Sequence, residues 1–278
     1  MVRIGFLGPK GTFSQEAMFT YTEGRNDFTG VDYNTMVELI MAVENDEIDE
    51  AVVPIENSLE GAVSVTMDML AADVDLKIKA EVVIEVKQNL MAKKGTETKD
   101  IKYILSHPQP IGQCRKFLDS AFPRALIKYV YSTAQAAKEV AQGEGDMAAI
   151  GSLAAAKEYG LEVLKESIQD SDNNFTRFVV ISKKEAKKAE RNKTSIVFST
   201  EDRPGSLYRI LDIFSLWDIN MTRIESRPAK NELGRYIFFV DIKGHIEDQD
   251  VRDALTMVKR KTSFYKFLGS YPEFQIRC

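Results

Sequence analysis

From Arg3 to Ser182 the chain alternates short apolar runs with amphipathic segments, and this alternation constrains its fold more than any other feature. Strand-length runs that alternate with segments of helical periodicity are typical of α/β domains, in which helices pack on a sheet. Residues 3–8 and 51–55 are predicted strands, and Thr12 with Gln15 has the spacing of a helix capping box. We therefore predict an α/β domain whose strands are mostly parallel.

A strand of alternating character divides this domain. Between Ile78 and Val86 apolar residues occupy every second position and most of the others are charged, which predicts a half-exposed strand. The rhythm of strand and helix begins again at residues 101–105. We predict that the alternating strand bridges two lobes and that a ligand binds beyond the carboxyl ends of the strands.

The stretch from Lys183 to Lys193 separates this domain from a smaller one. It holds five lysines, one arginine and hardly any apolar side chains, which predicts a solvated linker or an exposed helix. A nucleic-acid-binding patch is the alternative interpretation. We favour the linker because no aromatic residues are interleaved with the charges.

After the linker the pattern is strand, helix, two strands, helix and strand. The two predicted helices have apolar residues at helical spacing, namely Leu207, Ile210, Leu211, Phe214 and Trp217, and then Val251, Ala254, Leu255 and Val258. A polar turn at 231–234 joins the two middle strands. This βαββαβ order is typical of ferredoxin-like α+β modules. The predicted organisation is a first domain at 1–182, a linker at 183–193 and a second domain at 194–278.

Composition excludes several classes of function. With 278 residues and a prior of about 150 residues per domain, two domains are expected. The net charge of −5 gives no general attraction to nucleic acids or anionic membranes. Cys114 and Cys278 lie outside any CxxC or Cys/His pattern, which argues against disulfides and zinc. The start lacks a signal-peptide pattern and no apolar run has membrane-helix length, so we predict a reducing cytoplasm.

Four polar segments lie where an α/β domain binds ligands. Residues 8–14 (GPKGTFS) join the first strand to the first helix, and 54–58 (PIENS) follow the next buried strand. Residues 106–109 (SHPQ) follow another strand, and 174–178 (NFTRF) begin one. Each segment alone also has a structural interpretation as a glycine turn, a helix cap or a strand start. Their shared position predicts that one cleft collects them.

These four segments, in this order, are also those of the prephenate dehydratase family. The chain resembles that family from Val2 to Ser182, and its tail resembles the amino-acid-binding ACT domain through 203–207 (RPGSL) and 225–228 (ESRP). The resemblance implies a two-lobed catalytic domain with the layout of type II periplasmic binding proteins. It also implies conversion of prephenate to phenylpyruvate, with loss of water and carbon dioxide and without any cofactor or metal.

The resemblance further implies the roles of individual residues. Thr176 is the implied catalytic residue and donates a hydrogen bond to the departing hydroxyl. A threonine is not an acid at neutral pH, so a proton relay or an oriented dipole is the plausible role. The implied substrate-binding residues are Thr12, Ser14, Glu56, Asn57, Ser58, Ser106, His107, Gln109, Gln113, Arg177 and Phe178.

The tail implies feedback inhibition by L-phenylalanine. The implied allosteric residues are Gly205, Leu207, Glu225, Ser226, Arg227 and Pro228. Ser206 and Tyr208 depart from the alanine and the aliphatic residue that are usual in the family. Sensing domains of this kind generally pair their sheets, so the resemblance implies a homodimer or homotetramer.

Two other functions fit part of the same pattern. An arogenate dehydratase would perform the same chemistry on the aminated analogue of prephenate. A non-catalytic two-lobed sensor of small molecules would share the layout, although the lack of a signal-peptide pattern argues against a periplasmic receptor. The first strand begins at Arg3, so we expect no chorismate mutase segment ahead of it.

Overall fold

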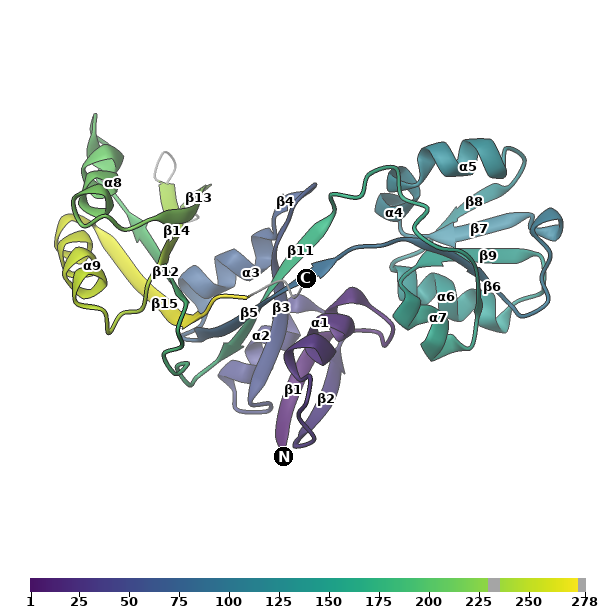
Figure 1. Cartoon of the computed structure of the whole chain (residues 1–278), viewed down its shortest axis with the longest axis horizontal. Helices are drawn as coiled ribbons and strands as arrows, with labels where there is room; N and C mark the ends of the chain where they lie inside the picture. The colour runs from purple at the N-terminus through teal and green to yellow at the C-terminus, as the bar shows by residue number, and fades with distance from the viewer. Residues whose placement is uncertain (230–235, 275–278) are drawn as a thin grey trace. The chain divides into compact units, whose positions relative to one another are not determined.

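The computed structural model describes residues 1–229 and 236–274 of the chain (Figure 1). The first of its sheets has the strand order β2-β1-β3-β11-β5, with β4 added to β3. Its strands are β1 (Val2–Leu7), β2 (Phe28–Tyr33), β3 (Glu50–Asn57), β4 (Gly61–Ala62), β5 (Lys77–Glu85) and β11 (Phe175–Ser182). The helices between these strands are α1 (Phe13–Tyr21), α2 (Met36–Glu44) and α3 (Ser64–Asp68).

A glycine and two hydroxyl groups hold the connection from β1 to α1. Gly11 has a φ of +86°, and a Cβ there would lie 2.9 Å from the Cα of Ala155, so the position requires glycine. Ser152 Oγ donates to the carbonyl of Gly11 (2.8 Å). Thr12 Oγ1 accepts from the backbone N–H of Gln15 (3.4 Å), which confirms the predicted cap of α1.

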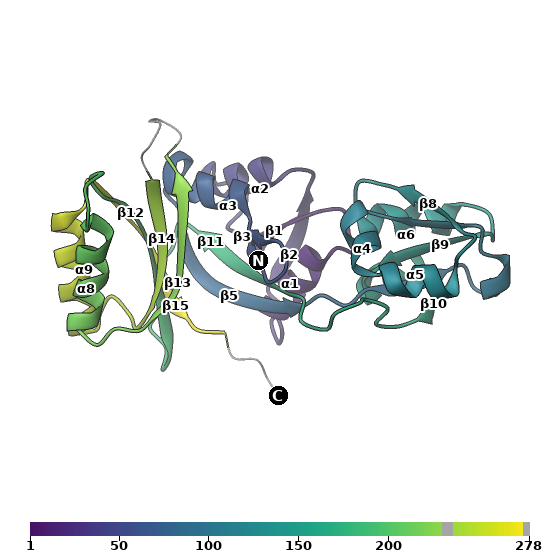
Figure 2. The ribbon, with the colours of Figure 1, turned by 90° about the horizontal axis from the view of Figure 1, so that it is seen from above.

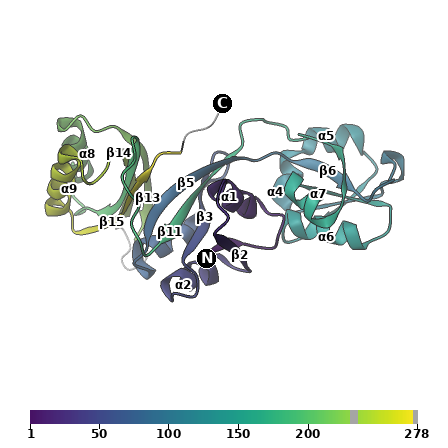
Figure 3. The same ribbon diagram turned by 60° about the horizontal axis from the view of Figure 1, so that its bottom comes forward.

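The second sheet has the order β10-β6-β9-β7-β8 and carries helices on both faces (Figure 3). Leu90 and Ala92 of β6 pack with α4 and α5, whereas Met91 between them packs with α6 and α7. This period of two is expected of a strand buried on both faces. The elements are β6 (Asn89–Ala92), β7 (Tyr103–Ser106), α4 (Pro108–Gln113), α5 (Arg115–Ala121), β8 (Leu126–Tyr129), α6 (Thr133–Gln142), β9 (Met147–Gly151), α7 (Leu153–Tyr159) and β10 (Glu162–Lys165).

This second sheet is mixed, so the expectation of mostly parallel strands holds for only part of it. Strand β7 is parallel to β8 and β9, but β6 is antiparallel to both β9 and β10. Parallel neighbours need a crossover connection, which the α4–α5 and α6 segments provide.

The third sheet is antiparallel and has the order β13-β14-β12-β15. Its elements are β12 (Asn192–Ser199), α8 (Ser206–Leu216), β13 (Met221–Pro228), β14 (Tyr236–Lys243), α9 (Gln249–Lys261) and β15 (Phe264–Pro272). Figure 2 shows α8 and α9 together on one face of the sheet. The predicted βαββαβ order is thus confirmed. The predicted turn at 231–234 lies outside the described residues.

The predicted linker is an irregular segment with bends at both ends, and not a helix, from Lys183 to Arg191, and β12 begins at Asn192. Lys183 Nζ pairs with a carboxylate oxygen of Asp46, and Lys188 Nζ pairs with Asp248. Two lysines of this segment, Lys183 and Lys188, therefore form ion pairs with neighbouring acidic groups.

By compactness the chain divides into two units. Unit 1 comprises residues 1–39, 52–61 and 83–178, and unit 2 comprises 40–51, 62–82 and the chain from Val179 onward. In the described part of the chain, no helix has the length and apolar character needed to span a membrane.

Candidate active site

A pocket of about 290 Å³ in unit 1 collects residues from several of the predicted segments. Five predicted site residues line it, namely Asn57, His107, Gln109, Gln113 and Thr176. The other lining residues are Phe13, Val86, Gln88, Pro110, Tyr131, Ser132, Thr133 and Asn174. The carboxyl end of β3, the start of β11 and the loops before α4 and α6 therefore meet at one pocket.

Asn57 fixes the orientation of the Thr176 hydroxyl. The Oδ1 of Asn57 accepts from the backbone N–H groups of Leu59 (2.9 Å) and Glu60 (3.0 Å), so its amide oxygen faces the turn after β3. Its Nδ2 therefore faces β11, where it donates to Thr176 Oγ1 (2.9 Å) and Asn174 Oδ1 (2.9 Å). Because Thr176 Oγ1 accepts this bond, its own proton is left to donate elsewhere. Among the described residues, none accepts that proton.

Further carboxamides continue this line along the pocket. Gln113 Oε1 accepts from Asn174 Nδ2 (3.3 Å) and from Gln88 Nε2 (3.4 Å). Gln88, Gln113, Asn174 and Asn57 thus form a hydrogen-bonded series that ends at Thr176, and we call these five residues the amide series. Such a series holds each member in one amide orientation.

Ser58 joins the loop after β3 to the start of β11. Its backbone N–H donates to the carbonyl of Phe175 (2.9 Å), and its Oγ donates to the carbonyl of Asn173 (2.8 Å) and accepts from the N–H of Phe175 (2.9 Å). Ser58 is exposed and outside the pocket lining, so its observed bonds position the two loops that carry Asn57 and Thr176.

Glu56 and Arg177 form an ion pair beside the pocket. Arg177 Nη1 lies 3.9 Å from Glu56 Oε2, and the side chains are 12% and 41% exposed, respectively. Neither residue lines the pocket. Phe178, the next residue of β11, is buried in the core.

Ser106, Thr12 and Ser14 lie within the fold around the pocket, and His107, which lines the pocket, also caps a helix. Ser106 is fully buried, and its Oγ donates to the carbonyl of Ile150 (2.8 Å). Thr12 caps α1, and its Oγ1 also donates to the carbonyl of Leu7 (2.9 Å), while Ser14 is buried. His107 caps α4 by accepting from the backbone N–H of Gln109 (3.3 Å).

The structure also adds lining residues that the sequence interpretation did not select. Asn174 stands inside the NFTRF segment, so its place in a shared motif was the available signal. Ser132 is the cap of α6, and a Ser followed by Gln135 at capping distance gives only a helix start. Gln88 follows the half-exposed strand without any motif, and nothing in the sequence separates it from a surface glutamine.

The lining is mixed, with Phe13, Val86 and Pro110 beside the polar residues, and it carries no carboxylate. Its ionisable groups are His107 and Tyr131, and the rest of its polar groups are amides and hydroxyls. The nearby thiol of Cys114 is fully buried, and burial, with the charge of Asp170, raises its pKa to about 12. This thiol stays protonated at neutral pH and is no nucleophile. Within the described chain, no three His, Cys, Asp or Glu side chains are placed to hold a metal ion.

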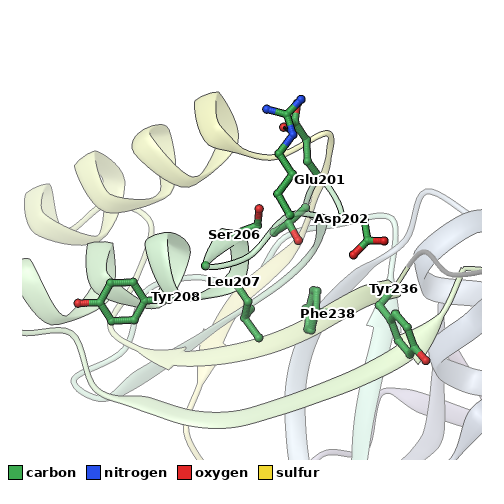
Figure 4. A pocket seen from close by; sticks show the side chains of 10 residues that line it. Glu201, Asp202, Ser206, Leu207, Tyr208, Tyr236 and Phe238 are labelled. Carbon is green, nitrogen blue, oxygen red and sulfur yellow. Dashed lines mark ion pairs between the residues drawn. The ribbon is translucent and has the colours of Figure 1, made fainter.

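A second pocket, of about 380 Å³, lies in unit 2 at the start of α8 (Figure 4). Gly205, at a φ of +79°, is the residue before α8, and Gly205 and Leu207, two of the implied allosteric residues, both line the pocket. In Figure 4 Leu207 points toward Phe238 of β14, whereas Tyr208 points away from both. The charged lining residues are Glu201, Asp202 and Arg203.

Alternate residues of the segment 225–228 in β13 lie on opposite faces of the sheet. Ser226 pairs with Phe238 and Pro228 with Tyr236, so these two residues lie on the same face of the sheet as the pocket residues of β14. Glu225 and Arg227 lie on the other face. There Arg227 forms a bidentate ion pair with Asp68 (2.9 and 3.2 Å), and its Nη1 donates to Ser64 Oγ (2.9 Å). Asp68 and Ser64 are both on α3. None of the four residues is in the pocket lining.

Comparison with known proteins gives consistent matches over nearly the whole chain. The prephenate dehydratase family matches residues 4–186, and the ACT domain family matches residues 194–256. A prephenate dehydratase of Methanocaldococcus jannaschii is 41% identical over 96% of this chain and 96% of its own length. The crystal structure of a prephenate dehydratase from Arthrobacter aurescens in complex with L-Phe is 37% identical, with a TM-score of 0.89 over 98% of this chain and 90% of that one. GqqA, described as a novel type of quorum quenching acylase, is 28% identical, with a TM-score of 0.86 over 97% of both chains.

Proposed function

The chain belongs to the prephenate dehydratase family and carries an ACT domain, and from this premise we propose that the pocket of the amide series is its active site. The reaction removes carbon dioxide and water from prephenate and gives phenylpyruvate. The observation that carries the proposal is the oriented hydroxyl of Thr176, whose proton is directed away from Asn57.

The proposed chemistry needs help at the departing hydroxyl. When the ring carboxylate leaves as carbon dioxide, the electron pair of the broken C–C bond enters the ring and the C–O bond to the hydroxyl breaks. The leaving oxygen gains negative charge in this step, so a preorganised donor lowers the barrier. Thr176 is that donor, and the bond it accepts from Asn57 polarises its hydroxyl further. Aromatisation supplies the driving force, so no electron sink is needed.

The rest of the pocket binds and orients the dianion. Gln113 accepts at its Oε1 from two amides, so its Nε2 is the group that can donate to a substrate carboxylate. Ser132 and Thr133 stand at the start of α6, where hydroxyls and the positive end of the helix favour an anion. We assign direct contact with substrate to the lining residues Asn57, His107, Gln109, Gln113 and Thr176. A supporting role is proposed for Thr12, Ser14, Glu56, Ser58, Ser106, Arg177 and Phe178.

Prephenate is the proposed substrate in preference to arogenate. Arogenate carries an ammonium group in place of the keto group of prephenate, and an ammonium is best bound by a carboxylate. None of the residues that line the described pocket is Asp or Glu. A competition assay with both compounds tests this preference, and a higher kcat/KM for arogenate would contradict it.

The primary test is the reaction itself. Purified protein incubated with prephenate should produce the ultraviolet absorbance of phenylpyruvate above a blank without protein. A non-catalytic sensor would leave the absorbance unchanged. A parallel assay for acylase activity, with an N-acyl amide as the probe, checks the activity named for GqqA, and turnover of that probe without turnover of prephenate would overturn the proposed function.

Feedback inhibition by L-phenylalanine is proposed to act through the second pocket. Leu207 and Phe238 offer an apolar surface for a benzyl side chain, and Arg203 with Glu201 and Asp202 offers charges for the amino acid's carboxylate and ammonium. The Arthrobacter aurescens relative, solved with L-Phe, supports this choice of effector. Calorimetry with L-phenylalanine tests it, and absence of heat at millimolar ligand would count against it. Inhibition requires tighter binding of the effector to the less active state.

Assembly, boundaries and location complete the proposal. Strand β13 is at the edge of its sheet, and pairing of two such edges would give the proposed homodimer or homotetramer. Light scattering after size exclusion measures the oligomeric state, and a monomer would contradict the proposed homodimer or homotetramer.

We keep the domains at 1–182 and 194–278 with a linker between them, which the family matches at 4–186 and 194–256 support. Cytoplasmic location stays a prediction from the sequence.

A further inference from the structure

We propose that Gln88 is a positioning residue of the active site, which holds the amide of Gln113 so that its NH₂ group faces the substrate. The inference rests on the function proposed above, because it assigns a role within the same pocket. No shared sequence segment contains Gln88.

Gln88 is buried at the pocket wall, and its side-chain NH₂ group has a hydrogen-bond partner there but its side-chain oxygen does not, among the described residues. It is 1% exposed and lines the pocket. Its backbone N–H donates to Gln169 Oε1 (3.0 Å) and its Nε2 donates to Gln113 Oε1 (3.4 Å). Its own Oε1 is buried and has no hydrogen-bond partner among the described residues. A buried amide with an unpaired oxygen lowers stability, so packing alone does not account for a glutamine at this position.

The bond from Gln88 has a direct consequence for Gln113. The amide group is planar, so two donors directed at its oxygen place the NH₂ group on the opposite side. Gln88 is one of these donors and Asn174 is the other. Without Gln88 only the bond from Asn174 restrains Gln113 Oε1, so the amide of Gln113 can more easily rotate and present its oxygen, which repels a carboxylate. Gln88 therefore acts together with Asn174 to favour the orientation that donates to an anionic substrate.

The first test replaces Gln88 by methionine. Gln88→Met keeps the length of the side chain and removes both polar ends. We expect an unchanged or higher Tm, because a buried unpaired amide oxygen is lost, together with a KM for prephenate higher by about tenfold and a similar kcat, as for loss of ground-state binding. A residue that serves only the structure would show the reverse, a lower Tm with a normal KM.

The second test uses pH. In Gln88→Glu a protonated carboxyl can donate to Gln113 Oε1, whereas the ionised form cannot and also repels the substrate. The protonated form prevails as pH falls, and burial favours it. Relative to the unsubstituted protein, kcat/KM of Gln88→Glu should rise as pH falls and should exceed that of Gln88→Met at the acidic end. If the ionised Glu side chain acts only by repelling the substrate, its protonation removes that repulsion. The kcat/KM of Gln88→Glu would then rise no higher than the kcat/KM of Gln88→Met.

The controls separate this effect from other titrations. His107 and Tyr131 line the pocket and Asp172 accepts from Gln169 Nε2 (3.2 Å), and these groups are common to all variants, so ratios to the unsubstituted protein remove them. A blank at each pH removes the acid-promoted reaction of prephenate. Gln142→Glu, at the exposed end of α6, adds the same charge to unit 1 and should leave the profile unchanged.

The outcomes distinguish this inference from the proposed function. If the unsubstituted protein does not turn over prephenate, the proposed function fails. If it does, but Gln88→Met has a normal KM or Gln88→Glu never exceeds Gln88→Met, the role of Gln88 is overturned.

Discussion

A single side chain, Asn57, determines which way the hydroxyl of Thr176, the proposed donor in this pocket, can donate. Its oxygen is held by the N–H groups of Leu59 and Glu60, and its nitrogen is thereby directed at Thr176. The role of Thr176 could be proposed from the shared segment NFTRF. The direction of its proton could not, because it depends on a turn that lies far from Thr176 in the sequence.

Removal of the Thr176 hydroxyl should lower turnover. We expect Thr176→Ala to reduce kcat by roughly 10² or more, because the leaving oxygen loses its donor. Thr176→Ser keeps a hydroxyl at the same place and serves as the matched control, with a loss of less than about tenfold. Steady-state kinetics with prephenate measures both, and circular dichroism checks that the fold is retained. Near-normal turnover of Thr176→Ala would remove Thr176 from this role.

The thiol of Cys114 should be inert in the folded protein. Burial raises its pKa to about 12, so at pH 8 its thiolate fraction is lower by roughly 10³ than that of a free thiol. Peptide mapping after iodoacetamide treatment at pH 8 should find Cys114 unmodified in the native protein and modified after denaturation. Rapid alkylation of the native protein at this residue would show that its surroundings open readily.

At the scale of elements, strand β15 approaches β5 closely because it lacks a side chain at one position. The pairing of β12 with β15 shifts at Leu268, which is a β-bulge, and Gly269 next to it has a φ of +135°. A Cβ on Gly269 would lie 2.5 Å from the carbonyl oxygen of Ile78 in β5. The strand β15 was expected from its apolar pattern, but neither its bulge nor its partner outside the sheet has a signal in that pattern.

Gly269→Ala should therefore destabilise the protein. We expect a loss of about 1–3 kcal/mol from forced backbone movement, seen as a lower Tm by differential scanning calorimetry. Gly24→Ala is the control for an αL glycine without a close contact, since Gly24 has a φ of +77° but nothing within 4 Å of its Cβ position. If both variants lose the same stability, the close contact with Ile78 contributes nothing.

The predicted elements differ in how strongly their sequences mark them. The cap of α1 and the capping box of Thr35 and Glu38, with reciprocal bonds of 3.1 and 3.2 Å, follow from side-chain spacing that acts within one helical turn. Strands β6 (Asn89–Ala92) and β8 (Leu126–Tyr129) were not expected, because neither run alternates apolar with polar side chains. Pairing with β9 and β7, which are distant in sequence, makes them strands.

At the scale of the whole molecule, we expect the ion pair of Arg227 to couple effector binding in the ACT domain to helix α3. Arg227 is on β13, and its partners Ser64 and Asp68 are on α3, which follows Asn57 closely along the chain. Arg227 and Asp68 are largely buried, with 19% and 16% exposure. The resemblance placed Arg227 among the implied allosteric residues, and its contact with α3 could not be foreseen, since the two segments are far apart in the chain.

Loss of this ion pair should weaken feedback inhibition without loss of catalysis. In Asp68→Asn we expect the concentration of L-phenylalanine for half inhibition to rise by about fivefold or more, within the usual range of allosteric coupling. The kcat/KM without effector should stay within about twofold, since Asp68 is outside the pocket lining. Inhibition curves measure the coupling and calorimetry measures the binding of L-phenylalanine. An unchanged inhibition curve would show that Arg227 only anchors β13.

The bond between Ser58 and Phe175 also bears on the chemical ageing of the protein. Asparagine deamidates when the backbone nitrogen of the following residue attacks the side-chain amide carbon and forms a succinimide. At Asn57 that nitrogen belongs to Ser58, and its N–H is committed to the carbonyl of Phe175 at 2.9 Å. The same contact that aligns the two loops thus shields the Asn57 amide, whose conversion to an aspartate would replace a donor by a negative charge beside Thr176.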